Sequence, residues 1–203
     1  MIRPLLCLPL AALLLAATPA AAQPDGLEKQ ARKLHALASG GYCEPLENAH
    51  DAESAYQSWT FSYDLYPGAA SDQEEITLIR IWCMTGAYNE VHAYYTYRNY
   101  EGLATLSFAV PAYETTYEDD EPIEGKLEDL TVLGFNATTI LTNSQYDPKT
   151  RTISDYSLWR GIGDASSSGT WNFNDGEWTL QRYEIDASYD GESNPETVVD
   201  YTE

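Results

Sequence analysis

The chain is poor in the residues that most metal and redox sites need. Its 203 residues include 3 cysteines and 3 histidines, and 11 lysines and arginines stand against 32 aspartates and glutamates. The formal net charge is −21. A surface this acidic repels nucleic acid and anionic lipid, so neither is expected as a partner, whereas cationic proteins and metal cations are attracted.

Signature motifs of the common enzyme classes are also missing. The sequence has no nucleophile elbow, no metalloprotease helix, no phosphate-binding loop and no cysteine–histidine signature. We therefore do not expect an enzyme. One enzymatic alternative stays open, an envelope glycan hydrolase that uses a pair of carboxylates, because the separation of two acids in space is a property of the fold.

Long apolar runs are confined to the N-terminus. Arg3 precedes a leucine- and alanine-rich run from Leu5 to Ala17, and three alanines follow at positions 20–22. This order is typical of a secretory signal peptide over residues 1–22, whose apolar part is shorter than the about 20 residues that span a bilayer. Residues 23–203 are expected to form one exported domain, periplasmic or secreted, with no stable membrane insertion.

Cysteine usage agrees with export. After removal of the signal peptide, Cys43 and Cys83 are the cysteines that remain. An even number of cysteines in an exported chain predicts a disulfide between them. Because no Cys-x-x-Cys pair exists, the bridge is expected to be structural rather than redox-active.

Hydrophobic spacing predicts one helix followed by strands. Apolar residues recur at helical spacing between Asp25 and Ser39, and Gly40-Gly41 end the segment. From Cys43 onward the period is two, which predicts strands at 59–65, 76–84, 91–98 and 103–110. The fold class is therefore mainly β, an antiparallel meander sheet or sandwich with one N-terminal amphipathic helix after the signal peptide.

The second half of the chain continues this pattern after an acidic interruption. Pro111 to Lys126 holds the densest run of acids and is expected to be an exposed loop. Strand-like composition resumes at 130–135 and 138–141. Between Asn143 and Arg182, turn residues at 147–150 and 174–176 predict consecutive antiparallel strands, with a loop at 160–164.

That stretch resembles a known family of exported bacterial proteins, the domain of unknown function 1176. The resemblance covers roughly residues 140–185 and rests on Tyr146-Asp147-Pro148-Lys149-Thr150-Arg151-Thr152 and on Arg160-Gly161-Ile162-Gly163-Asp164. It implies a periplasmic, mostly β protein with no assigned activity. One departure is Ala165, where the family usually has a cysteine, and the downstream cysteine is missing too. A fainter similarity links the same stretch to exported lysozyme-inhibitor-like β proteins.

Two groups of residues are candidates for binding. The first is the loop Arg160, Gly161, Gly163 and Asp164, whose glycines permit close backbone approach, although an architectural turn is the alternative. The second is Asp186, Ser188, Asp190 and Asn194, which have the spacing of the first half of a calcium loop. Thr197 replaces the glutamate at the twelfth position, so an acidic surface turn is the alternative there.

These observations lead to one preferred function and two alternatives. We expect a soluble periplasmic binding protein whose partner is a cationic protein such as a lysozyme. The alternatives are a calcium-binding structural protein and the glycan hydrolase. No cofactor other than calcium is expected, and the sequence contains no evidence on the oligomeric state.

Overall fold

The computed structural model describes residues 24–66, 72–118 and 125–202, so the predicted signal peptide lies outside the described residues. Three short helical elements precede the strands: α1 (Pro24–Ser39), the 3-10 helix η1 (Leu46–Asn48) and α2 (Ala52–Ala55). The strands are β1 (Tyr56–Asp64), β2 (Gln73–Thr85), β3 (Glu90–Arg98), β4 (Gly102–Thr105), β5 (Phe108–Tyr117), β6 (Leu127–Thr138), β7 (Ile140–Thr142), β8 (Gln145–Asp147), β9 (Thr152–Leu158), β10 (Ser166–Asn174), β11 (Glu177–Asp186) and β12 (Glu196–Asp200). The prediction of a mainly β, antiparallel fold with one N-terminal amphipathic helix is confirmed.

One five-stranded sheet has the order β1-β2-β3-β4, with β7 also paired to β3. The predicted strand 76–84 corresponds to β2, which lies between β1 and β3. Its two faces serve different cores. Ile76 and Leu78 pack in the main core, whereas Ile79 and Ile81 pack on the opposite face of the sheet against Ala31 of α1.

The second five-stranded sheet has the order β12-β11-β10-β9-β8. Its turns lie where the sequence predicted them, between β8 and β9 and between β10 and β11. Arg151, Asp175 and Gly176 have positive φ angles of 53°, 47° and 90° there. Aspartate and glycine tolerate this left-handed conformation better than most residues, so Asp175 and Gly176 suit the turn between β10 and β11.

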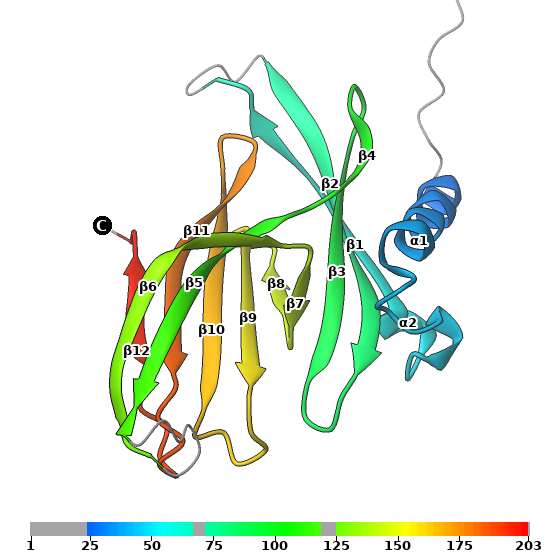
Figure 1. Ribbon diagram of the computed structural model, residues 1–203. Helices are drawn as coiled ribbons and strands as arrows, with labels where there is room; N and C mark the ends of the chain where they lie inside the picture. Colours follow the sequence, from blue (N-terminus) through cyan, green and yellow to red (C-terminus); the bar gives the residue numbers. More distant parts are fainter. Residues whose placement is uncertain (1–23, 67–71, 119–124, 203) are drawn as a thin grey trace, which may run out of the picture.

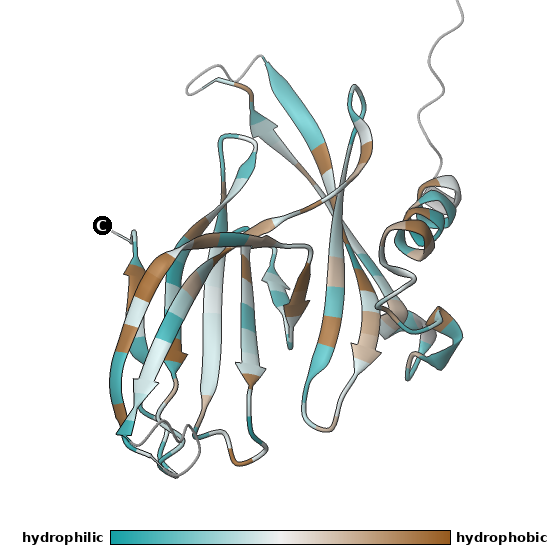
Figure 2. Ribbon diagram, in the orientation of Figure 1, coloured by the Kyte–Doolittle hydropathy of each residue, from teal (hydrophilic) through white to brown (hydrophobic). Residues whose placement is uncertain are grey.

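The strands β5 and β6 form a separate two-stranded ribbon that crosses the second sheet (Figure 1). The main core lies between the two large sheets and this ribbon, and includes Tyr94, Phe108, Trp171 and Ile185, each at most 1% exposed. Hydropathy alternates along β6 (Figure 2), as expected for a strand with one face on the core and one in solvent.

The helix α1 covers the outer face of the first sheet and is tied to it at its C-terminal end (Figure 1). The predicted disulfide joins Cys43, just after α1, to Cys83 in β2, with an S–S distance of 2.06 Å. The Glu44 amide also donates to the Cys83 carbonyl oxygen at 2.8 Å. Within the described residues, no helix is long and apolar enough to cross a membrane.

Two predictions about strand boundaries are wrong. The expected strand 103–110 is two strands, because β4 ends at Thr105 and β5 begins at Phe108. The expected acidic loop begins too early, since residues 111–117 belong to β5, and residues 119–124 lie outside the described part of the chain. In β5 the one acidic side chain, Glu114, faces solvent while Tyr113 and Tyr117 are partly buried, so the charge of the segment hid a strand pattern.

Candidate functional site

The two predicted binding segments meet at one end of the second sheet. The loop 159–165 connects β9 to β10, and the turn 187–195 connects β11 to β12. Because β10 pairs with both β9 and β11, these connections emerge at the same end of adjacent strands. The Tyr117 hydroxyl at the tip of the β5–β6 ribbon donates to the Ala187 carbonyl oxygen at 2.8 Å. We call this surface, made of residues 113–118, 159–165 and 187–195, the loop end (bottom of Figure 1).

The loop that carries Arg160, Gly161, Gly163 and Asp164 is a closed turn. The Trp159 amide donates to the Ala165 carbonyl oxygen at 2.9 Å, and the Gly163 amide donates to the Arg160 carbonyl oxygen at 3.0 Å. Gly163 has a φ angle of +79°, a conformation that glycine adopts without the steric cost of a side chain. Ile162 at its tip is 71% exposed.

Arg160 and Asp164 join this loop to the neighbouring turn. The Arg160 guanidinium donates from Nε to Asp164 Oδ1 at 2.9 Å and from Nη2 to Asp164 Oδ2. The same Nη2 donates to the Tyr189 carbonyl oxygen at 3.0 Å. The Gly191 amide donates to Asp164 Oδ2 at 2.9 Å. The buried Asp164 carboxylate is therefore satisfied from both segments, as a buried charge must be.

The chemistry of Asp164 follows from these contacts. Hydrogen bonds from the Arg160 guanidinium hold the pKa of Asp164 below its usual range. The carboxylate stays ionised at neutral pH and has no proton to give. It therefore acts as a fixed acceptor that holds two loops together, which agrees with the architectural alternative for this motif.

The predicted calcium ligands lie in one turn, but hydrogen bonds within that turn occupy several of their oxygens. Asp186 is buried, and its Oδ1 accepts hydrogen bonds from the Ser188 amide at 3.1 Å and from the Ser188 hydroxyl at 2.7 Å. Its Oδ2 accepts a hydrogen bond from the Asn194 amide at 2.6 Å. Asp190 is exposed and accepts from the Glu192 amide at 2.9 Å. Across residues 24–66, 72–118 and 125–202, no three His, Cys, Asp or Glu side chains are arranged to hold a metal ion. Calcium binding stays a prediction.

Behind these turns lies a group of aromatic rings. Tyr113 stacks on Trp159 with ring centroids 6.0 Å apart and planes 3° from parallel. Trp159 in turn lies 6.2 Å from the Tyr189 ring, and the Arg160 guanidinium carbon is 5.5 Å from the Tyr189 ring centroid. Burial, together with the nearby tyrosines, raises the pKa of Tyr113 to about 12, so its hydroxyl stays neutral and polar near neutral pH.

Exposed acids lie in and next to the segments that carry these rings. Glu118, Asp190 and Glu192 are exposed at the loop end, and Glu196 is exposed where β12 begins. Within the described residues, none of these four acids forms an ion pair, because the arginines and the histidine in ion pairs contact other carboxylates. Arg160 is committed to Asp164 and Tyr189, so its charge is largely neutralised within the chain. The loop end therefore presents unpaired negative charge beside aromatic and apolar surface.

Sequence reasoning found the two turns but missed the aromatic residues between them. Tyr113 lies in β5, whereas Trp159 and Tyr189 lie in two separate connections, and no local pattern places the three together. A signal for Tyr113 was present, because Tyr113, Thr115 and Tyr117 alternate with Glu114, Thr116 and Glu118. The high charge of the segment favoured a loop over this strand period.

Comparison with known proteins gives one match. The model of the family described as "Protein of unknown function (DUF1176)" matches residues 8–195. The resemblance predicted for residues 140–185 is thereby confirmed and extended over most of the chain. No curated protein and no solved structure matches, so the fainter similarity to lysozyme-inhibitor-like proteins has no support from these comparisons.

Proposed function

The chain belongs to the DUF1176 family of proteins of unknown function, and we propose that it is a binding protein whose loop end holds a cationic protein. The observation that carries this proposal is the set of exposed, unpaired carboxylates around the aromatic rings of the loop end. The overall charge of −21 adds a long-range attraction that brings a basic partner to the surface faster than diffusion alone.

The exposed carboxylates supply directional contacts for a basic partner. Asp190 and Glu192 lie two residues apart on a turn that is fixed by hydrogen bonds to buried Asp164 and Asp186. A carboxylate on a rigid turn loses less side-chain and backbone freedom on binding than one on a flexible segment. Lysine and arginine side chains of a partner can pair with these acids without competition from Arg160, which is already bound.

The apolar part of the loop end supplies the contacts that a charged rim alone lacks. Ile162 projects from the tip of the loop, and the partly buried rings of Trp159 and Tyr189 lie behind it. Exposed Tyr88 extends this surface, because its hydroxyl donates to the Trp159 carbonyl oxygen at 3.3 Å. An apolar and aromatic centre within a charged rim is the usual composition of a protein interface.

The proposed partner is a basic protein outside the cytoplasm. A lysozyme is the first protein to test, because lysozymes are small, exported and strongly basic. Binding of purified protein to lysozyme is measured by calorimetry over a salt series, together with lysozyme activity. We expect binding that is strongest at low ionic strength and weakens as salt screens the charges. No binding and no inhibition at low salt would remove lysozyme as the partner.

A matched pair of variants locates the surface. Asp190→Asn with Glu192→Gln removes two charges at the loop end, and Asp175→Asn with Glu177→Gln removes two exposed charges at the opposite end of β10. We expect the first pair to weaken binding by about tenfold and the second by less than about twofold. Equal losses for the two pairs would mean that net charge alone drives the association, and the proposed surface would be wrong.

A further inference from the structure

A second acidic region has no role in the proposed function, and we propose that it binds an aliphatic ammonium group. It is a cleft of about 440 Å³ between the C-terminal end of α1 and the segment 43–47, beside the disulfide. The inference goes beyond the proposed function, because the cleft lies on the helix side of the first sheet and shares no residue with the loop end.

The walls of the cleft are held in place by covalent and backbone contacts. The Cys43–Cys83 disulfide and the hydrogen bond from the Glu44 amide to the Cys83 carbonyl oxygen fix one wall on β2. The amides of Tyr42 and Cys43 both donate to the Ser39 carbonyl oxygen, at 2.8 and 2.7 Å. These contacts turn the chain sharply after α1, so the hollow is part of the fold rather than a gap in a loose loop.

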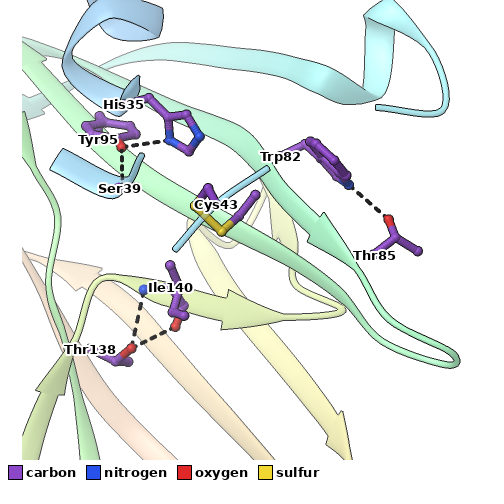
Figure 3. The surroundings of a disulfide bond; sticks show 9 residues. His35, Ser39, Cys43, Trp82, Thr85, Tyr95, Thr138 and Ile140 are labelled. Atoms are coloured by element: carbon purple, nitrogen blue, oxygen red, sulfur yellow. Dashed lines mark hydrogen bonds between the residues drawn. A yellow bond between two sulfur atoms is a disulfide. The ribbon is translucent and has the colours of Figure 1, made fainter. Parts of the chain in front are cut away.

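Among the described residues, His35 lines the cleft and has a ring nitrogen that lacks a partner. The residue is 3% exposed, and its Nδ1 lies 2.9 Å from the Tyr95 hydroxyl, which is itself 3.5 Å from the Ser39 hydroxyl (Figure 3). Within the described residues, Nε2 is buried and has no hydrogen-bond partner. Leaving a buried polar atom unpaired is unfavourable, so a ligand that pairs with it is stabilised.

The protonation state of His35 decides which ligand fits. Burial, and then the charge of Arg32, lower the pKa of His35, so the imidazole is neutral at pH 7. With the proton on Nδ1 donated to Tyr95, Nε2 is an acceptor and requires a donor from the ligand. The proposal therefore requires this tautomer.

The other polar groups of the cleft are acceptors as well. Glu44 and Glu47 line it and are exposed at its mouth, and the last turn of α1 contains no basic residue. The helix C-terminus adds a partial negative charge. No lysine or arginine is among the described residues along the wall. A cation with N–H donors meets all of these groups, whereas an anion is repelled.

The apolar part of the wall defines the rest of the ligand. Ala36, Pro45 and Leu46 line the cleft together with the disulfide. Such a surface fits a chain of methylene groups, which gains by leaving water while its charged end stays at the carboxylates. A primary ammonium on an unbranched aliphatic stem has both properties. A free amine and the side chain of a lysine share this chemistry.

The test is a titration of the ¹⁵N-labelled protein with n-pentylammonium at pH 7, followed by NMR on the His35 ring and by calorimetry. We expect saturable binding and a change at His35 Nε2, with the ¹⁵N shifts of the free protein indicating a protonated Nδ1. 1-Pentanol and pentanoate have the same stem, and each should bind at least about tenfold more weakly. Equal binding of either compound, no binding of the amine, or a protonated Nε2 in the free protein overturns the proposal.

Two variants and two ligands complete the experiment. Glu44→Gln with Glu47→Gln should weaken pentylammonium binding by about tenfold, while Asp190→Asn with Glu192→Gln, which removes equal charge at the loop end, should change it by less than about twofold. Equal effects of the two pairs contradict the site. Cadaverine and Nα-acetyl-lysine methylamide then distinguish the sources, since only the second tests whether a lysine of a protein enters the cleft. Loss of lysozyme binding in the earlier experiment would leave these results unaffected.

Discussion

The loop end and the cleft beside the disulfide are both acidic, but their buried polar groups are satisfied in different ways. At the loop end, Asp164 and Asp186 accept hydrogen bonds from the chain on both carboxylate oxygens, and nearby Asp190 and Glu192 are exposed. In the cleft, His35 Nε2 stays without a partner in a hollow lined by Glu44 and Glu47. An exposed acidic surface suits a large basic partner, whereas a hollow with an unpaired ring nitrogen suits a small donor.

A motif that stands out in the sequence is therefore not always the place where a polar group is left free to bind a ligand. The Arg-Gly-x-Gly-Asp loop stands out in the sequence, yet its charged side chains bind each other and the adjacent turn. The cleft has no notable motif, yet His35 of α1 leaves a ring nitrogen open there. Hydrogen-bond satisfaction in the fold, rather than residue type alone, separates scaffold from site.

The largest expected effect comes from removing the covalent support of the cleft. The disulfide joins residues that are 40 positions apart in the sequence. Removing it with Cys43→Ala and Cys83→Ala frees the unfolded chain from this link and should lower the free energy of unfolding by about 3 to 4 kcal/mol in the chain-entropy account. Denaturant unfolding followed by circular dichroism measures the change. Pentylammonium binding should be lost while lysozyme binding by the folded fraction is kept, and loss of both together would show that the two regions are not independent.

A smaller effect is expected from pH, because buried histidines resist protonation whereas Asp164 is already charged. Burial lowers the pKa of His92 to about 3 from the usual 6.5, so the unfolded chain binds more protons at His92 between these values, and the contribution of His92 to stability falls as pH falls through that window. His92 alone should cost about 2 kcal/mol between pH 7 and 5, and His35 adds to this cost. Burial raises the pKa of Asp155 to about 7, so the folded chain binds the extra proton at Asp155 and this group opposes the two histidines over the same interval.

Two variants separate the regions in this pH experiment. His35→Gln should remove the His35 contribution to the slope between pH 7 and 5, leaving the contributions of His92 and Asp155. Asp164→Asn should leave the slope between pH 7 and 5 unchanged. The pKa of Asp164 is lowered in the folded chain, so its contribution to stability is lost only when pH falls below the ordinary pKa of an aspartate, which lies under this interval. Thermal melts at a series of pH values give the slopes, and a wild-type slope in the His35 variant would contradict its neutral, buried state.

The smallest of these effects tests the turn that closes the cleft. A Cβ at Gly40 would overlap the carbonyl oxygen of Ala36, whereas a Cβ at Gly41 meets nothing within 4 Å. Gly40→Ala should therefore lower the free energy of unfolding by about 1 to 2 kcal/mol. Gly41→Ala should change it by less than about 0.5 kcal/mol. Equal effects of the two substitutions would show that the turn after α1 is not tightly packed.

Much of the fold could be predicted because its signals are local. The spacing of apolar residues gave the helix that ends at Ser39, turn residues gave the hairpins at 147–150 and 174–176, and counting cysteines gave the disulfide. Errors arose where a high density of charged residues predicted a loop although the alternation of side chains predicted a strand. In the segment 111–117 the single acid, Glu114, is exposed on β5, and a count of charges over residues 111–126 does not distinguish an exposed strand face from a loop.

The site could be predicted only in part, because it depends on contacts between distant segments. Arg160 lies 29 residues from Tyr189, and Tyr113 lies far from both in sequence, so no spacing rule joins them. The cleft is even less visible, since it depends on where the chain after α1 crosses β2. Sequence identifies acids and aromatic residues, but pairing in space decides which of them remain available.

The most direct test of this account is to map the surface that a cationic protein covers. ¹⁵N-labelled protein is titrated with lysozyme at low ionic strength, and amide shifts are followed residue by residue. The account predicts that the largest changes lie at Ile162, Asp190 and Glu192, with small changes at the turn of Asp175 and Gly176. Changes concentrated at that opposite turn, or spread evenly over the acidic surface, would contradict a binding site at the loop end.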